Sequence, residues 1–168
     1  MILNKNNALL FFTPYGDDGY LSNWYLSDFI VDEIEFHSGE QWFMYSKAIL
    51  FNDKEVADMI LNISMNRIKD NKSVKALGRQ VRNFDEQTWV LKREDLIYKG
   101  LYEKFKQNPE LANKLLSTGD KLLVEASPYD RIWGIGLSSD EKNAWDTDKW
   151  LGTNVLGKVL MRVRSDLK

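Results

Sequence analysis

The stretch Ser38-Gly39-Glu40-Gln41-Trp42-Phe43-Met44-Tyr45-Ser46-Lys47-Ala48 carries an acid and an amine on an aromatic-rich helix. Ser38 followed by Gln41 three residues later has the form of a capping box, which predicts that a helix starts here. Glu40 and Lys47 are two helical turns apart, so their side chains leave the same face about 10 Å apart along the axis. That spacing suits a ribose ring and the bond that leaves its anomeric carbon. An amphipathic helix with a solvated Glu and Lys explains the spacing equally well.

Length and composition predict one folded domain spanning residues 1–168. The chain is 43% hydrophobic and 29% charged, with few prolines and glycines, which is typical of a globular protein. It has neither an apolar run long enough to cross a membrane nor an export signal, so we expect a cytoplasmic protein without a membrane partner. The formal charge of −2 gives no field that attracts long nucleic acid, and a nucleotide would have to be recognised locally.

The chain has no cysteine and only one histidine, His37. Disulfides, thiolate nucleophiles and cysteine-based zinc sites are therefore excluded, and a multi-histidine metal site is excluded as well. No serine motif surrounds His37 that would make it the base of a Ser-His triad. We expect no metal and no cofactor.

Turn and cap signals divide the chain into short elements. Turn residues at 14–19 end a first strand, Asp32-Glu33 forms a turn between two more, and Thr118-Gly119 ends a helix. Asp53, Asn108 and Asn154 are candidate N-caps, and Ser64 is a candidate cap of a further short helix. These signals predict an α+β fold, a mainly helical single domain with a small antiparallel sheet. The predicted strands are 8–13, 29–31, 34–36 and 122–126, and the predicted helices are 40–51, 53–62, 73–81, 86–106, 109–116 and 155–165.

Several separated pieces of the chain together resemble the NADAR/YbiA-like family (NAD and ADP-ribose associated). They are Leu21-Ser22-Asn23-Trp24, the helix from Ser38 through Lys47-Ala48, Leu77-Gly78-Arg79, the run Val124-Glu125-Ala126 through Asp130-Arg131-Ile132-Trp133-Gly134-Ile135-Gly136, and Asn154-Val155-Leu156-Gly157 through Arg164. The pieces occur in the family's order and cover nearly the whole chain. Two departures stand out: Gly39 separates Ser38 from Glu40, and Gln41 stands where the family often has histidine.

The resemblance implies an N-glycosidase acting on a ribosyl nucleotide, with Glu40, Lys47 and Asp130 as catalytic residues. Glu40 would stabilise the oxocarbenium-like centre or act as a base, since the helix dipole favours its carboxylate. Lys47, desolvated among aromatic residues, would be a neutral amine that attacks the anomeric carbon and forms a Schiff base with the opened ribose. The alternative for Lys47 is an ion pair with Glu40.

The resemblance also implies a set of substrate-binding residues. Arg79 would bind a diphosphate, or form a structural salt bridge instead. Trp133 would stack on a base or cover the ribose, with a buried indole as the alternative. Asn154 would cap the last helix, whose N-terminus is a natural phosphate seat. The full set is Ser22, Asn23, Trp24, Phe43, Arg79, Trp133, Gly134 and Asn154.

Three functions remain open from the sequence. The first is removal of ADP-ribose from ADP-ribosylated guanine, free or in nucleic acid. The second is hydrolysis of the ribosylamino-pyrimidine phosphates made early in riboflavin biosynthesis. The third is a non-catalytic ADP-ribose-binding module, which would not need the Glu40–Lys47 pair. The oligomeric state is not predicted.

Overall fold

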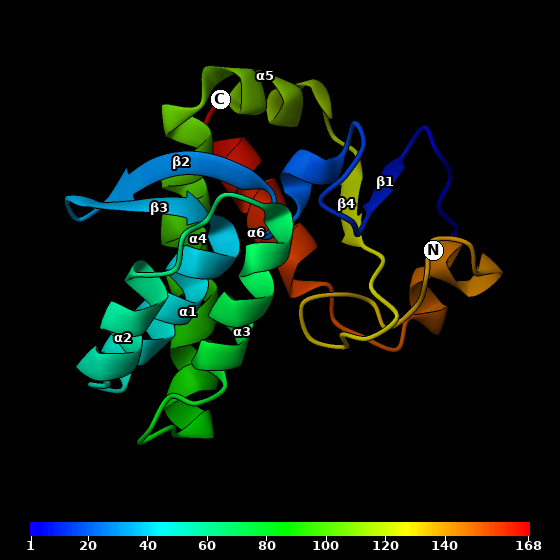
Figure 1. Cartoon of the computed structure of the whole chain (residues 1–168). Coiled ribbons are helices and arrows are strands. Elements are labelled where there is room, and N and C mark those ends of the chain that lie inside the picture. Colours follow the sequence, from blue (N-terminus) through cyan, green and yellow to red (C-terminus); the bar gives the residue numbers. More distant parts are fainter. The chain divides into compact units, whose positions relative to one another are not determined.

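The computed structural model describes all 168 residues (Figure 1). They form two compact units. The continuous unit runs from Asn23 to Pro109. The two-segment unit combines Met1–Ser22 with Glu110–Lys168. The continuous unit is mainly helical and each unit contains one short strand pair, which confirms the predicted α+β class.

The continuous unit is a β-hairpin followed by four helices. Its elements are β2 (Leu26–Val31), β3 (Ile34–Ser38), α1 (Gly39–Leu50), α2 (Lys54–Leu61), α3 (Asn71–Gly78) and α4 (Glu86–Gln107). The strands are antiparallel, and the predicted turn is confirmed: Asp32 and Glu33 have φ of 49° and 65°, as a two-residue hairpin turn requires. The register shifts between Leu26 and Phe29, which marks a bulge.

Capping side chains explain where α1 and α2 begin. Ser38 Oγ accepts a hydrogen bond from Gln41 N at 3.0 Å, as predicted, but Gln41 Oε1 reaches back to His37 N rather than to the cap residue. Asp53 Oδ1 accepts from Val56 N, so α2 starts as expected. The short helix predicted after Ser64 is wrong. The next turn instead forms at a 3₁₀ segment, Ile68–Asp70, where an Asp70 carboxylate oxygen accepts from Arg67 N.

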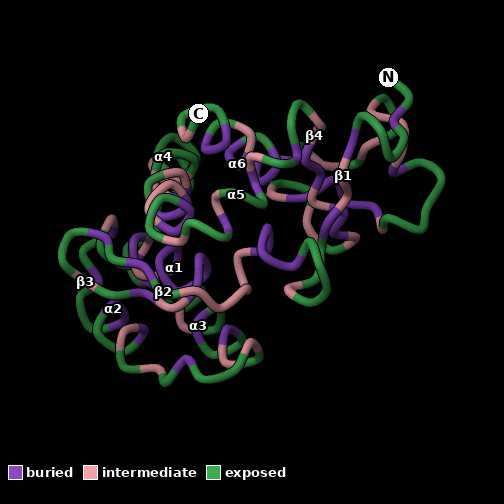
Figure 2. Tube along the Cα trace, turned by 90° about the horizontal axis from the view of Figure 1, so that it is seen from above, coloured by how far each residue is buried: buried purple, intermediate pink, exposed green.

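The hairpin packs its inner face on α1. Phe36 and Trp42 meet edge to face at a ring-centroid distance of 5.3 Å, and Phe29 and Val31 complete the buried cluster. Trp42 Nε1 donates to Leu96 O in α4, which fixes the indole between the two helices. Figure 2 shows α1 drawn almost entirely in the colours of buried and intermediate residues.

The two-segment unit contains the strands predicted at 8–13 and 122–126, but in a parallel pairing that the sequence did not predict. β1 (Ala8–Phe11) pairs with β4 (Leu122–Glu125) in parallel, with Ala8 opposite Leu122, so the predicted antiparallel sheet describes only β2 and β3. A hairpin cannot join parallel strands, and here the whole continuous unit lies between them in sequence. The helices of this unit are α6 (Val155–Asp166) and, apart from its first residue, α5 (Pro109–Ser117). Gly119, with φ of 59°, follows α5 as the glycine predicted to end it.

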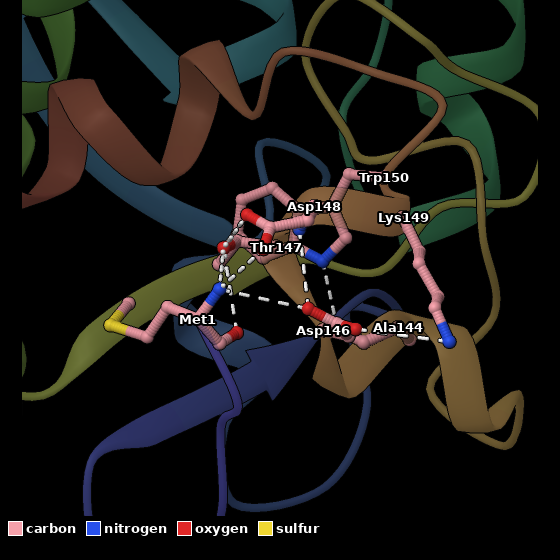
Figure 3. A network of polar contacts seen from close by, with 7 residues as sticks. All are labelled: Met1, Ala144, Asp146, Thr147, Asp148, Lys149 and Trp150. Carbon is pink, nitrogen blue, oxygen red and sulfur yellow. Dashed lines mark hydrogen bonds and ion pairs between the residues drawn. The ribbon is translucent and has the colours of Figure 1, made fainter.

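The N-terminus is held by a polar network (Figure 3). The Met1 amino group donates to Thr147 Oγ1 at 2.9 Å and forms ion pairs with Asp146 and Asp148 at 3.6 and 3.2 Å. Leu3 N donates to Trp145 O. Two 3₁₀ turns, Lys142–Trp145 and Thr147–Lys149, therefore bind the first residues of the chain. None of the helices has the length and apolar character needed to span a bilayer.

Candidate active site

Glu40 lies in the first turn of α1 and is 6% exposed. Its backbone N–H donates to Asn23 O at 2.9 Å. A Cβ on Gly39 would lie only 3.0 Å from Asn23 Oδ1, so the absence of a side chain there lets the loop approach the helix. The sequence motif around Asn23 and the start of α1 thus form one local structure.

Asn71, which sequence reasoning missed, binds this structure together. Its Oδ1 accepts from Ser38 Oγ at 2.7 Å, and its Nδ2 donates to Trp24 O at 3.0 Å. The residue is fully buried at the start of α3. The cap of α1 and the backbone of Trp24 are therefore held by one side chain from a third segment.

Lys47 is half-buried, and its amine is held by backbone and rings. Nζ donates to Gly78 O at 2.8 Å and lies 4.6 Å from the ring centroid of Phe84 and 5.6 Å from that of Trp89. The hydrogen bond thus goes to a carbonyl and not to the carboxylate of Glu40. Burial lowers the pKa of the Lys47 amine from its ordinary value of 10.5, because water is removed from around the charged form.

An aromatic cluster lies beside the amine, where Phe43 of α1 and Phe51, its C-cap, pack on the two rings that Lys47 contacts. Phe43 packs on Trp89 with centroids 5.1 Å apart, and Phe51 packs on Phe84 at 5.2 Å. Phe84 is nonetheless 46% exposed. Sequence reasoning missed Phe84 and Trp89 as site residues. The available signal was an aromatic pair in the α3–α4 link and the first turn of α4.

Gly78 and Arg79 lie at the C-terminal end of α3, close to Lys47. A Cβ on Gly78 would lie 2.0 Å from Met44 Sδ, so glycine allows α3 to pack closely on α1 and brings its carbonyl to Lys47. Arg79 is the C-cap of α3, where a positive charge is favoured by the helix dipole. Its guanidinium is exposed and forms no ion pair, so the structural salt bridge considered for it is absent.

In the two-segment unit, Asp130 organises its own loop. Its Oδ1 accepts from Ile132 N at 2.8 Å and from Trp133 N at 2.7 Å, and its carbonyl accepts from Gly136 N. A Cβ on Gly134 would lie 2.9 Å from Glu125 O, so this loop lies directly against β4. Trp133 is half-buried. The catalytic role of Asp130 stays a prediction.

Asn154 is the N-cap residue of α6, as predicted, but its side chain makes no capping hydrogen bond to the helix. The residue is left-handed, with φ of 52°, and its amide points to β4. Nδ2 donates to Leu123 O and Oδ1 accepts from Glu125 N, both at 2.9 Å. Both polar atoms of the side chain are hydrogen-bonded to backbone groups of β4, so neither is available to cap the helix.

Lys104 is a second buried amine, which sequence reasoning did not single out. It lies on α4, is 0% exposed, and stands 5.5 Å from the ring centroid of Tyr25. Burial lowers its pKa to about 7. Ser22 is also buried, at the end of the 3₁₀ segment Gly19–Leu21, where its N–H donates to Gly19 O.

The predicted site residues are divided between the units. The continuous unit holds Asn23, Trp24, Glu40, Phe43, Lys47 and Arg79, and the two-segment unit holds Ser22, Asp130, Trp133, Gly134 and Asn154. Within the continuous unit, Phe43 and Lys47 share contacts with Trp89, and Asn23 contacts the backbone of Glu40.

Sequence comparison relates this chain to known proteins. N-glycosidase R617 of Acanthamoeba polyphaga mimivirus is 45% identical over 132 residues, covering 79% of this chain and 75% of the viral protein. A riboflavin biosynthesis protein of Vibrio vulnificus is 29% identical over 160 residues, and the chain spans 38% of its length.

A solved structure resembles the whole chain. The NMR structure of the Escherichia coli protein YbiA has a TM-score of 0.76 and 26% identity, covering 99% of this chain and 88% of YbiA. The model of the NADAR domain matches residues 10–168, which include most of both units. The chain therefore belongs to the NADAR domain family.

Proposed function

We propose that this chain hydrolyses the N-glycosidic bond of a ribosyl nucleotide, and that the substrate is ADP-ribosylated guanine. The chain is a hydrolase acting on N-glycosyl bonds, since several relatives in its family are named N-glycosidases. The observation that supports the site is the environment of Lys47: a half-buried amine on the same helix as a buried carboxylate, with two aromatic rings beside it.

Lys47 acts as the nucleophile in this proposal. Its lowered pKa raises the fraction of neutral amine near neutral pH, which is the form that can attack carbon. The amine nitrogen forms a bond to the anomeric carbon, the bond to the base nitrogen breaks, and the base leaves with a proton. Opening of the ribose gives an iminium ion, and water then releases the sugar and restores the amine.

Glu40 stabilises positive charge at the anomeric carbon while the base departs. The dipole of α1 favours its carboxylate form at this position. Arg79 binds the diphosphate in this proposal, because its exposed guanidinium presents a fork of N–H donors that suits phosphate oxygens. Its loss should raise KM about tenfold, which corresponds to about 1.4 kcal/mol.

A second substrate class has a specific observation in its favour. Relatives from Vibrio vulnificus and Zea mays are named riboflavin biosynthesis proteins, and they align over 95% and 97% of this chain. The ribosylamino-pyrimidine phosphates of that pathway contain the same kind of bond between a ribose carbon and nitrogen. They are the alternative substrate.

Product analysis tests both substrates. The protein is incubated with ADP-ribosylated guanosine and, separately, with the ribosylamino-pyrimidine phosphates, and release of the base is followed by chromatography. We expect release from the guanosine adduct. Release from the pyrimidines alone would select the alternative. Binding of ADP-ribose without any release would leave only a binding module.

Borohydride trapping tests the amine route. Reduction during turnover should attach the sugar to the protein, and peptide mass spectrometry should locate it at Lys47. Lys75→Met is the matched control, because Lys75 is an exposed lysine of α3, and this variant should be trapped like the native chain. Turnover without any adduct, or an adduct that persists in Lys47→Met, would contradict the route.

A further inference from the structure

The β2–β3 hairpin carries a cluster of metal-ligating side chains on its outer face. Asp28 comes from β2, and Glu35 and His37 come from β3. One ligand atom from each lies within 4.8 Å of the other two, and His37 Nδ1 is 2.7 Å from Asp28 Oδ1. Alternation along the strands separates these three residues from Phe29 and Phe36, which face the core.

The backbone beneath two of these side chains is held by helices of the same unit. Asn108 Nδ2 donates to Asp28 O at 2.9 Å, and His37 N donates to Gln41 Oε1 at 2.9 Å. Two residues beyond Asp28 in β2, the backbone of Ile30 is held as well. Its N–H donates to the Gln107 side chain and its carbonyl accepts from that side chain, each at 2.8 Å. The ligands therefore project from a fixed hairpin even though their tips are exposed.

The bulge in β2 explains why three ligands meet. The register shifts between Leu26 and Phe29, so Asp28 lies in the irregular part of the strand, beside His37. Glu35 is two residues from His37 and leaves β3 on the same side. An extra residue at a bulge re-aims a side chain, and here it brings a carboxylate to the imidazole.

We propose that Asp28, Glu35 and His37 bind a divalent first-row transition-metal ion, with Zn²⁺ as the best fit. An imidazole nitrogen with two carboxylate oxygens is a ligand set that Zn²⁺ accepts at about 2.0–2.2 Å, leaving one tetrahedral position for water. Bonds of that length require ligand atoms roughly 3.3–3.6 Å apart. Binding would therefore lengthen the 2.7 Å contact between His37 Nδ1 and Asp28 Oδ1 and draw in the Glu35 carboxylate, which now lies within 4.8 Å of both.

The same ligand set disfavours Ca²⁺ and Mg²⁺. These ions take six or more oxygen ligands, whereas this cluster offers only three side chains, one of them through nitrogen. A bound ion also offsets the repulsion between the Asp28 and Glu35 carboxylates. The site is separate from the proposed catalytic pair, because these three side chains lie on the outer hairpin face and Glu40 is buried.

Zinc titration of the tag-free protein tests the site. Calorimetry should give one ion per chain, and the single histidine makes the NMR signals of its imidazole ring unambiguous reporters. We expect Zn²⁺ to shift both ring signals of His37. In His37→Gln, affinity should fall at least about 100-fold, and in Asp28→Asn or Glu35→Gln at least about tenfold.

Glu33→Gln is the matched control. Glu33 is an exposed acid on the turn of the same hairpin but is outside the cluster, so this variant should bind Zn²⁺ like the native chain. Circular dichroism without metal should be unchanged in all four variants, since the hydrogen bond from His37 N to Gln41 is made by the backbone. No binding by the native chain, unchanged binding in His37→Gln, or an equal loss in Glu33→Gln would overturn the proposal.

Discussion

Lys47 in the continuous unit and the pair Asp130 and Asn154 in the two-segment unit use their polar groups differently. Lys47 makes one hydrogen bond, to Gly78 O, and its amine is otherwise in contact with aromatic rings. Asp130 and Asn154 each bind two backbone groups. Asp130 and Asn154 each hold two backbone groups and so mainly stabilise the fold, whereas the Lys47 amine holds a single carbonyl and is otherwise desolvated by rings, which leaves it available for chemistry. We therefore expect substitutions in the first region to reduce activity and substitutions in the second to reduce stability.

Replacement of Lys47 should have the largest effect. Lys47→Met removes the proposed nucleophile but keeps an apolar side chain among the rings, so kcat should fall at least about 1000-fold. Ligand affinity should stay within about tenfold of the native value. Steady-state kinetics and ADP-ribose titration measure the two effects, with Lys75→Met as control. A large drop in melting temperature with kcat retained would reverse the comparison.

Replacement of Asn154 should have the largest effect on stability. Asn154→Ala leaves Leu123 O and Glu125 N without their side-chain partner, which should cost about 3 kcal/mol of unfolding free energy. Urea denaturation measures the change. Asn143→Ala is the control, because Asn143 is exposed in a 3₁₀ turn of the same unit and should be nearly neutral. Equal stability of the two variants would contradict the structural role.

Two substitutions can separate the loop-stabilising role of Asp130 from its predicted catalytic role. Asp130→Asn keeps an oxygen that accepts from Ile132 N and Trp133 N, whereas Asp130→Ala removes it and should cost about 1 kcal/mol. If the loop contact is the main role, Asp130→Asn should retain activity within about threefold. A loss of 100-fold or more in Asp130→Asn, with normal stability, would instead establish the carboxylate as part of the chemistry.

A modest effect is expected on the pH dependence of activity. Activity needs neutral Lys47 and rises with pH through the pKa of that amine, which burial has lowered. Phe84→Ala admits water, so this pKa should rise, the ascending limb should move to higher pH, and the rate near pH 7.5 should fall by less than about tenfold. The attraction between the ring and the cation, about 0.5–1 kcal/mol, works in the opposite sense and limits the shift.

Phe12→Ala is the control for this profile. Phe12 is an exposed phenylalanine of the two-segment unit. The pH profile of activity in the Phe12→Ala variant should therefore match that of the native chain. A limb that moves to lower pH in Phe84→Ala would mean that the ring favours the charged amine more than it excludes water.

Local signals in the sequence predicted much of the continuous unit. The cap at Ser38, the turn at Asp32-Glu33 and the cap at Asp53 each depend on residues that are neighbours in the chain, and all three were found. The helix predicted after Ser64 does not form, because a capping residue alone does not make the following residues helical. The next helical turn forms where the Asp70 carboxylate accepts a hydrogen bond from Arg67 N.

The features that sequence reasoning missed depend on distant residues. The parallel pairing of β1 with β4 joins segments with no shared turn signal. Asn154 has the position of a helix cap, but its amide binds β4, and a pattern read along the chain does not show that contact. The rings at Lys47 come from the α3–α4 link and α4, so only the fold shows which aromatics reach the amine.

The parallel pairing of β1 with β4 constrains how the protein matures on the ribosome. Every residue of the hairpin and of helices α1 to α4 is synthesised before β4 leaves the exit tunnel, so that unit can become ordered while β1 still has no strand to pair with. Closing so long a loop is slow, and the opening segment stays open to chaperones in the meantime. The first strand made is among the last to be secured.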